Sequence, residues 1–109
     1  NPVLVATVTL MNRHIDDPLS MDELADAAGY SRRHLERLFH EAVGKAPGEF
    51  YRDLRLDRGR NLLSTTDLTL MEVALACGYS TVSHFSKSFR ARFGTAPTKL
   101  AQGMVQKSL

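Results

Sequence analysis

Apolar residues recur at helical spacing in two separate stretches of the chain, and in each stretch a glycine divides a short pattern from a longer one. Such spacing places apolar side chains on one face of a helix. Each stretch therefore predicts a short helix followed by a longer one, packed through their apolar faces. The residues expected in this core are Leu24, Ala25, Ala28, Leu35, Leu38 and Phe39 in the first stretch and Val73, Ala74, Cys77, Phe85 and Phe89 in the second.

Capping residues mark the ends of these helices. Ser20 with Glu23, and Thr69 with Glu72, form the S/T-x-x-E pattern of a capping box, in which hydroxyl and carboxylate oxygens accept from backbone N–H groups at a helix start. Each short helix is expected to end at a left-handed glycine, and each long helix to start at a serine N-cap and close at another glycine. These positions are Gly29, Ser31 and Gly44 in the first stretch and Gly78, Ser80 and Gly94 in the second.

The two stretches are copies of one another. LSMDELADAAGYS at 19–31 and LTLMEVALACGYS at 68–80 agree at Leu, Glu, Ala, Ala, Gly, Tyr and Ser without a gap. The second copy then gains one residue, after which His34 and Phe39 match His84 and Phe89. Two units are too few for a solenoid, which needs at least three stacked repeats. A pair of similar reading heads is the favoured interpretation.

The segments around the copies also predict helices. A mostly apolar helix follows Pro2 and ends near Asp16, and a helix of about four turns follows Pro47, with Leu56, Leu62 and Leu63 at helical spacing. Gly59 interrupts this helix at a cost of about 1 kcal/mol relative to Ala, so either a neighbouring helix packs closely there or the helix bends. We expect subdomains at 1–46 and 65–109 joined by a linker helix at 47–64. A last short helix after Pro97 is expected to end in a tail at 106–109.

Charge is distributed unevenly along the 109 residues, although the net charge is only +2. Residues 1–30 carry one Arg against five acids, and the rest carries thirteen Lys or Arg against seven acids. A localised basic excess suits a polyanion because it displaces condensed counterions from phosphates, although an evenly solvated surface is the alternative on charge alone. The lone Cys77, the absence of any apolar run near the roughly 18 residues of a membrane span and the absence of a secretory signal predict a cytoplasmic protein with no membrane partner.

A short helix, a tight turn and a longer helix form the helix-turn-helix arrangement, in which the second helix enters the major groove of DNA. Arginine can hold guanine bidentately and glutamate can accept from cytosine, while hydroxyl groups suit phosphates or bases. A merely solvated helix face is the competing interpretation, which the repetition of the whole unit disfavours. The candidate DNA-binding residues are Arg32, Arg33, His34, Glu36 and Arg37 in the first unit and Thr81, Val82, Ser83, His84, Ser86, Lys87 and Arg90 in the second.

The sequence shows no pattern typical of base stacking, metal binding or catalysis. Tyr30 and Tyr79 lie in the turns, where packing is a better interpretation than base stacking. His34 and His40 are on different helical faces, and Cys77 has no ligand at metal spacing, so no metal is expected. No phosphate loop, nucleophile elbow or carboxylate pair is present, so neither a cofactor nor an enzyme activity is expected.

At these residues the chain resembles the DNA-binding domain of the AraC/XylS family of bacterial transcription regulators. The resemblance is carried by LSMDELADAAGYSRRHLERLFHEAVGKAP, by RLDRGRNLL and above all by VALACGYSTVSHFSKSFRARFGTAP. It implies an all-α fold of seven helices, with two helix-turn-helix subdomains joined by a long central helix and each second helix in one of two adjacent major grooves. It also implies base reading by Arg33, Glu36, Arg37, Val82, Ser83, Ser86 and Lys87, and backbone contacts by Arg32, His34, His84 and Arg90.

Three positions depart from the family pattern. Pro97-Thr98-Lys99-Leu100 stands where Pro-x-x-Tyr-Arg is common, which removes the usual Arg from any backbone contact. Gly59 replaces a usual alanine, and Val82 can touch only a thymine methyl. The opening 20 residues resemble the junction after an amidotransferase-like sensor domain, and the missing initiator Met suggests an excised fragment.

The expected partners are double-stranded DNA and RNA polymerase, with this fragment a monomer and any dimerisation residing in a companion domain. The alternative function is a protein-interaction module that contacts RNA polymerase or another partner.

Overall fold

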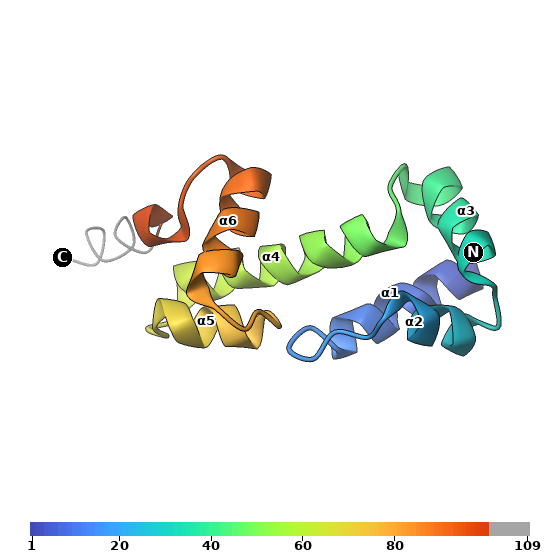
Figure 1. Cartoon of the computed structure of the whole chain (residues 1–109), viewed down its shortest axis with the longest axis horizontal. Helices are drawn as coiled ribbons and strands as arrows, with labels where there is room; N and C mark the ends of the chain where they lie inside the picture. The colour runs from blue at the N-terminus through green and yellow to red at the C-terminus, as the bar shows by residue number, and fades with distance from the viewer. Residues whose placement is uncertain (101–109) are drawn as a thin grey trace. The chain divides into compact units, whose positions relative to one another are not determined.

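The computed structural model describes residues 1–100, and within them the chain is helical with tight connections and no strand (Figure 1). The helices are α1 (Pro2–Arg13), α2 (Met21–Ala28), α3 (Arg32–Val43), α4 (Pro47–Thr65), α5 (Leu70–Ala76) and α6 (Val82–Phe93). Residues 97–100 are also helical and begin a seventh. The predicted all-α fold of seven helices is confirmed; the tail expected at 106–109 lies outside the described residues.

Two compact units divide the chain, Asn1–Leu54 and Arg55–Leu109, and α4 contributes residues to both. Unit 1 contains α2 and α3, and unit 2 contains α5 and α6, each pair being the short and long helix of one sequence copy. Each unit has its own apolar core. The buried core residues are Met11, Leu24, Ala25, Leu35, Phe39 and Tyr51 in unit 1 and Leu56, Leu63, Val73, Ala74, Cys77, Tyr79, Phe85 and Phe89 in unit 2.

The periodicity identified most of these core positions correctly. Ala28 and Leu38 were also expected in the core and are half-buried. Met11, Tyr51 and Tyr79 complete the cores from α1, α4 and the second turn.

Both capping boxes form as predicted: Ser20 Oγ accepts from Glu23 N at 3.1 Å, and Thr69 Oγ1 accepts from Glu72 N at 3.1 Å. The Ser80 N-cap was wrong. Thr81 caps α6 instead, with its Oγ1 accepting from His84 N at 3.1 Å. The residue gained by the second copy lengthens the turn, so the cap moves one position along the chain.

Two other helix ends differ from expectation. The first helix ends at Arg13 rather than near Asp16, because the backbone leaves helical geometry at His14 (φ −126°, ψ 57°). In unit 2, α5 is capped by Cys77, and Gly78 follows with φ 81°, so the left-handed residue lies one position beyond the cap.

Tyr51 of α4 ties down the connection between α1 and α2 in unit 1. Its hydroxyl accepts a hydrogen bond from Leu19 N at 3.1 Å and donates one to the backbone carbonyl of His14. The two partners flank the loop, so a single buried side chain fixes both the exit from α1 and the entry to α2.

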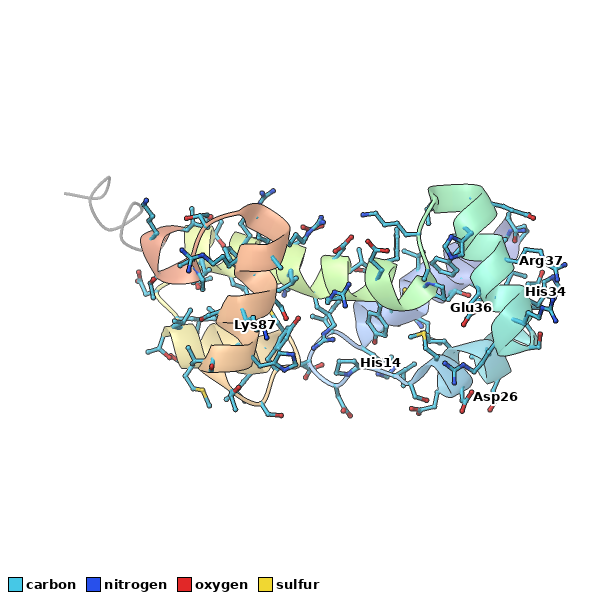
Figure 2. The ribbon with its side chains drawn as sticks, turned by 45° about the horizontal axis from the view of Figure 1, so that its top comes forward. His14, Asp26, His34, Glu36, Arg37 and Lys87 are labelled. Atoms are coloured by element: carbon cyan, nitrogen blue, oxygen red, sulfur yellow. The ribbon has the colours of Figure 1, made fainter. Side chains whose placement is uncertain are left out.

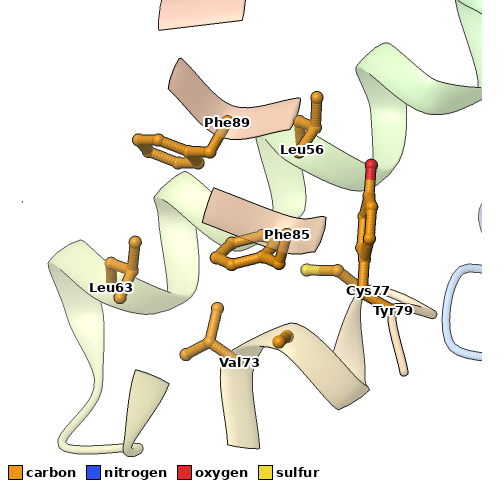
Figure 3. Packing of buried hydrophobic residues seen from close by; sticks show 8 residues of the cluster. Leu56, Leu63, Val73, Cys77, Tyr79, Phe85 and Phe89 are labelled. Atoms are coloured by element: carbon orange, nitrogen blue, oxygen red, sulfur yellow. The ribbon is translucent and has the colours of Figure 1, made fainter. Parts of the chain in front are cut away.

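Gly59 explains how α4 packs in unit 2. A Cβ placed on Gly59 would lie 2.9 Å from Cζ of Phe85 and 3.1 Å from Sγ of Cys77. The sequence left open whether this glycine marks close packing or a bend, and the close approach of α6 to the α4 backbone supports packing. Figure 3 shows Phe85 and Cys77 in this core with Leu56, Leu63 and Val73.

Candidate nucleic-acid interface

The second helix of unit 1, α3, presents a polar face to solvent. Ser31 Oγ accepts from His34 N at 3.1 Å and so fixes the start of the helix. Leu35 and Phe39 are buried on one face. The predicted DNA-binding residues Arg32, Arg33, His34, Glu36 and Arg37 are all exposed, and Figure 2 shows His34, Glu36 and Arg37 projecting from α3.

The charged side chains of this face are mostly unpaired. Arg32 Nε lies 3.6 Å from Asp22 Oδ1, but both side chains are more than half exposed (56% and 73%), and such a surface pair contributes little. Within residues 1–100, Arg33, Glu36 and Arg37 have no ion pair or side-chain hydrogen bond. Two guanidinium groups and one carboxylate are therefore available to an incoming ligand.

In unit 2, α6 also exposes polar groups, but on a less uniform face. Ser83, His84, Lys87 and Arg90 are exposed, and Figure 2 shows Lys87 on this helix. Ser86 is half-buried. Two of its positions carry short side chains, since Ser83 matches Arg33 and Ser86 matches Glu36 of α3, whereas Lys87 matches Arg37.

Two of the predicted DNA-binding residues of unit 2 also stabilise the fold. Val82 is half-buried and packs against the unit 2 core, so only part of its side chain is accessible. Thr81 is exposed, but its hydroxyl oxygen is occupied by the cap of α6. The sequence marked Val82 as unable to hydrogen-bond a base, but it did not show that Val82 and Thr81 also stabilise the fold.

The turn tyrosines pack against histidines. Tyr30 stacks on His34 with ring centroids 3.8 Å apart and nearly parallel planes, and Tyr79 meets His84 edge-on at 5.0 Å. Tyr79 is only 4% exposed, which excludes it as a stacking platform for bases. The packing role expected of Tyr79 is confirmed, while Tyr30 is half-buried and shares its ring face with His34.

Acidic and basic groups are separated between the helices of each pair. The first turns of α2 and α5 carry Glu23 and Glu72, whereas the first turns of α3 and α6 carry no acid. Hydrogen bonds from the backbone and side chain of Ser20 lower the pKa of Glu23, and those from Thr69 lower that of Glu72. The first turns of α3 and α6 thus contain no acid of their own, which suits phosphate binding, although Asp22 of α2 lies beside Arg32 at the start of α3.

The sequence did not identify one residue that holds the turn before α6. Arg55 of α4 is half-buried and hydrogen-bonds the backbone carbonyls of Cys77 and Gly78 in the second turn. The available signal was its place at the start of RLDRGRNLL, but only the tertiary structure shows what it touches.

Residues 1–100 hold no group of three His, Cys, Asp or Glu side chains arranged to bind a metal ion. Burial raises the pKa of the Cys77 thiol to about 11, so this cysteine is a core residue in its protonated form. No helix in the described part of the chain has the length and apolar content to cross a membrane.

Comparison with known proteins gives consistent similarities. A family model described as a helix-turn-helix domain matches residues 24–103. The chain is 46% identical over 99 residues to the HTH-type transcriptional regulator CdhR of Pseudomonas aeruginosa, covering 91% of this chain and 30% of CdhR. It is 42% identical over 102 residues to GbdR, an HTH-type transcriptional regulator of the same species, covering 94% and 28%. The chain thus spans about 30% of the length of these curated relatives.

Solved structures share the fold. One is a transcriptional regulator from Chromobacterium violaceum, described among AraC-type DNA-binding domain-containing proteins. It superposes with a TM-score of 0.89 at 41% identity and covers 96% of this chain and 94% of that chain. The DNA-binding domain of AdpA, a global transcriptional factor solved in complex with a target DNA, superposes with a TM-score of 0.89 at 27% identity, covering 95% and 94%.

Proposed function

This chain belongs to the AraC/XylS family of helix-turn-helix transcription regulators, and we propose that it binds double-stranded promoter or operator DNA sequence-specifically. The observation that carries the proposal is the repeated, N-capped second helix whose exposed polar groups face solvent. The similarity to the DNA-binding domain of AdpA, which was solved with a target DNA, supports it.

The two second helices would serve as recognition helices. An α-helix fits the major groove, and residues in its first turns can reach base edges while the preceding helix lies on the backbone. Arg33, Glu36 and Arg37 would read bases from α3. The corresponding residues of α6 are Val82, Ser83, Ser86 and Lys87, with the two helices in adjacent major grooves.

Backbone contacts would fix the register of each unit. Arg32 and His34 in unit 1, and His84 and Arg90 in unit 2, are exposed and carry groups that hydrogen-bond phosphate. Thr81 caps α6, so its contribution is to orient the first-turn N–H groups toward a phosphate.

The wider protein is proposed to be a cytoplasmic bacterial regulator without catalytic activity. Residues 1–46 and 65–109 would form the two reading subdomains and 47–64 the connecting helix, in keeping with two compact units that share α4. An amidotransferase-like sensor domain would precede them, and any dimerisation would reside there, with this fragment a monomer.

A contact with RNA polymerase is proposed from exposed apolar side chains on α5 and just before it. Leu68, Met71 and Leu75 are 39%, 44% and 50% exposed. The first sequence copy has Asp22 and Asp26 at the places of Met71 and Leu75. The fold tolerates acids at those places, so the apolar side chains suit a protein surface.

Selection of bound duplexes from a random pool tests the proposed DNA binding. We expect enrichment of a site with two half-sites about one helical turn apart. A shuffled duplex of the same length and composition is the control, titrated at the same salt concentration. Equal affinity for the selected and shuffled duplexes would overturn the proposal.

A further inference from the structure

Arg55 makes an unusually complete set of contacts with the turn that precedes α6. Its Nε donates to the carbonyl of Cys77 at 2.8 Å and its Nη2 donates to the carbonyl of Gly78 at 3.0 Å. The guanidinium carbon also lies 4.5 Å from the centroid of the Tyr79 ring. One side chain from α4 therefore contacts three consecutive residues of the turn.

These carbonyls need an external donor. α5 ends at Ala76 with Cys77 as its C-cap, and the last carbonyls of a helix have no intrahelical partner. No basic residue lies in the last turn of α5. Arg55 supplies the cation from α4, and its planar fork spans two acceptors at once with little loss of side-chain freedom.

The contacts continue from the turn into α6. The buried Tyr79 ring lies under the guanidinium and meets His84 and Phe85 edge-on, at centroid distances of 5.0 and 5.5 Å. His84 and Phe85 are in the first turn of α6. The direction in which α6 leaves the turn is thus held from α4 through Arg55 and Tyr79.

The corresponding turn of unit 1 is built differently. Within residues 1–100, no side chain of another helix hydrogen-bonds the carbonyls of Ala28 and Gly29, which match Cys77 and Gly78. Tyr30 is half-buried and stacks on His34. In this unit Tyr51 of α4 accepts a hydrogen bond from Leu19 N, before α2, rather than a side chain of α4 binding the turn. Among the described residues, a side chain of α4 anchors the turn in unit 2 and not in unit 1.

We infer that Arg55 is a positioning residue for DNA recognition, which fixes the turn and so aims α6, rather than a phosphate ligand. The inference rests on the proposed function. It explains how Ser83 and Ser86 of α6 can be placed accurately, since their short side chains leave little reach to correct a tilt of the helix.

Arg55→Lys separates the two roles, because lysine keeps the charge but offers no fork to span both carbonyls. With the full chain and the selected duplex, we expect Arg55→Lys to weaken binding about tenfold. Discrimination at the bases read by α6 should fall, while discrimination at the α3 half-site stays as in the unchanged protein. Arg58→Lys is the matched control, since Arg58 is exposed on the same helix and should bind normally.

The salt dependence of DNA binding by Arg55→Gln gives a second test of the two roles. A positioning residue leaves the slope of log affinity against log salt unchanged, whereas loss of a phosphate contact lowers it by about 1. Normal affinity of Arg55→Lys, equal loss of discrimination at both half-sites, or a lowered slope for Arg55→Gln would overturn the inference. A wild-type chain without sequence preference would instead overturn the proposed function.

Amide hydrogen exchange in the DNA-free protein tests the inference without a DNA-binding assay. We expect faster exchange at residues 79–85 in Arg55→Lys, with residues 30–35 unchanged. Unchanged exchange at 79–85 would also overturn the inference.

Discussion

Gly59 on α4 and Phe85 on α6 meet with no room for a side chain between them, since an added Cβ would lie 2.9 Å from Cζ of Phe85. Phe85 is fully buried between Phe89 and Tyr79, so its ring has little freedom to withdraw. The chain gives up the helix propensity of alanine at this position and gains a close contact between the two helices.

Gly59→Ala is therefore expected to destabilise the protein. Overpacking a core costs about 1–3 kcal/mol, against a gain of about 1 kcal/mol in helix propensity, and the clash with a fully buried ring favours the larger cost. Chemical denaturation followed by circular dichroism measures the net loss. Gly48→Ala is the matched control in the same helix: its Cβ would meet only Met21 Sδ at 3.8 Å, so a gain of about 0.4–1 kcal/mol is expected. Stability of Gly59→Ala equal to or above that of the unchanged protein would contradict this account.

Two buried tyrosines offer a comparison of hydroxyl groups. Tyr51→Phe leaves the backbone groups of His14 and Leu19 without their partner and should cost about 1–3 kcal/mol. Tyr79→Phe removes a buried hydroxyl that has no hydrogen-bond partner in the described chain, so it should be neutral or slightly stabilising. Urea midpoints of the two variants provide the measurement. A larger loss from Tyr79→Phe than from Tyr51→Phe would reverse the assignment.

The capping boxes predict a dependence of stability on acidity. The pKa values of Glu23 and Glu72 are lowered in the folded chain from the ordinary value of 4.5, chiefly by hydrogen bonds from the backbone of Ser20 and Thr69. The two carboxylates therefore stabilise the folded chain above pH 4.5, and this stabilisation is lost as the pH falls through their lowered pKa values. A Glu23→Gln, Glu72→Gln variant keeps the hydrogen-bonding pattern without the charge.

We expect the unfolding midpoint of that variant to change less between about pH 5 and pH 3 than the midpoint of the unchanged chain. Equal changes of the unfolding midpoint with pH in the two proteins would show that the carboxylates do not act through the caps. Replacing Glu49 by Gln serves as a control for the loss of an exposed carboxylate elsewhere.

Arg37 and Arg90 are predicted to act differently on DNA. Arg37→Ala should cost about 1–3 kcal/mol and relax base preference at one position. Arg90→Ala should weaken all sequences similarly and reduce the salt slope by about 1. Titration of the selected duplex and its single-base variants at several salt concentrations measures both. Arg13→Ala removes the same charge from α1 as a control, and identical sequence-blind losses from Arg37→Ala and Arg90→Ala would refute the division of roles.

The sequence predicted those features that depend on local spacing. Leu35, Phe39, Phe85 and Phe89 were placed in the cores because helical periodicity marks a buried face, and both capping boxes formed because each joins residues three apart. Ser80 was misjudged because a one-residue insertion shifts a cap without changing the surrounding pattern.

Contacts between distant parts of the chain had no such signal. Nothing about Arg55 or Gly59 in sequence identifies the carbonyls or the ring that each meets, since these lie more than 20 residues away. The DNA-binding roles of individual residues stay predictions, because they depend on a duplex as well as on the fold.

The separate cores of the two units carry a genetic consequence. A substitution that empties one core, such as loss of Phe39 or of Phe89, removes packing from one unit and leaves the core residues of the other unchanged. Under the proposed function, such variants should still bind DNA weakly through the recognition helix of the unaffected unit. A screen should then recover graded phenotypes in which regulation is blunted, instead of a simple division into active and dead alleles.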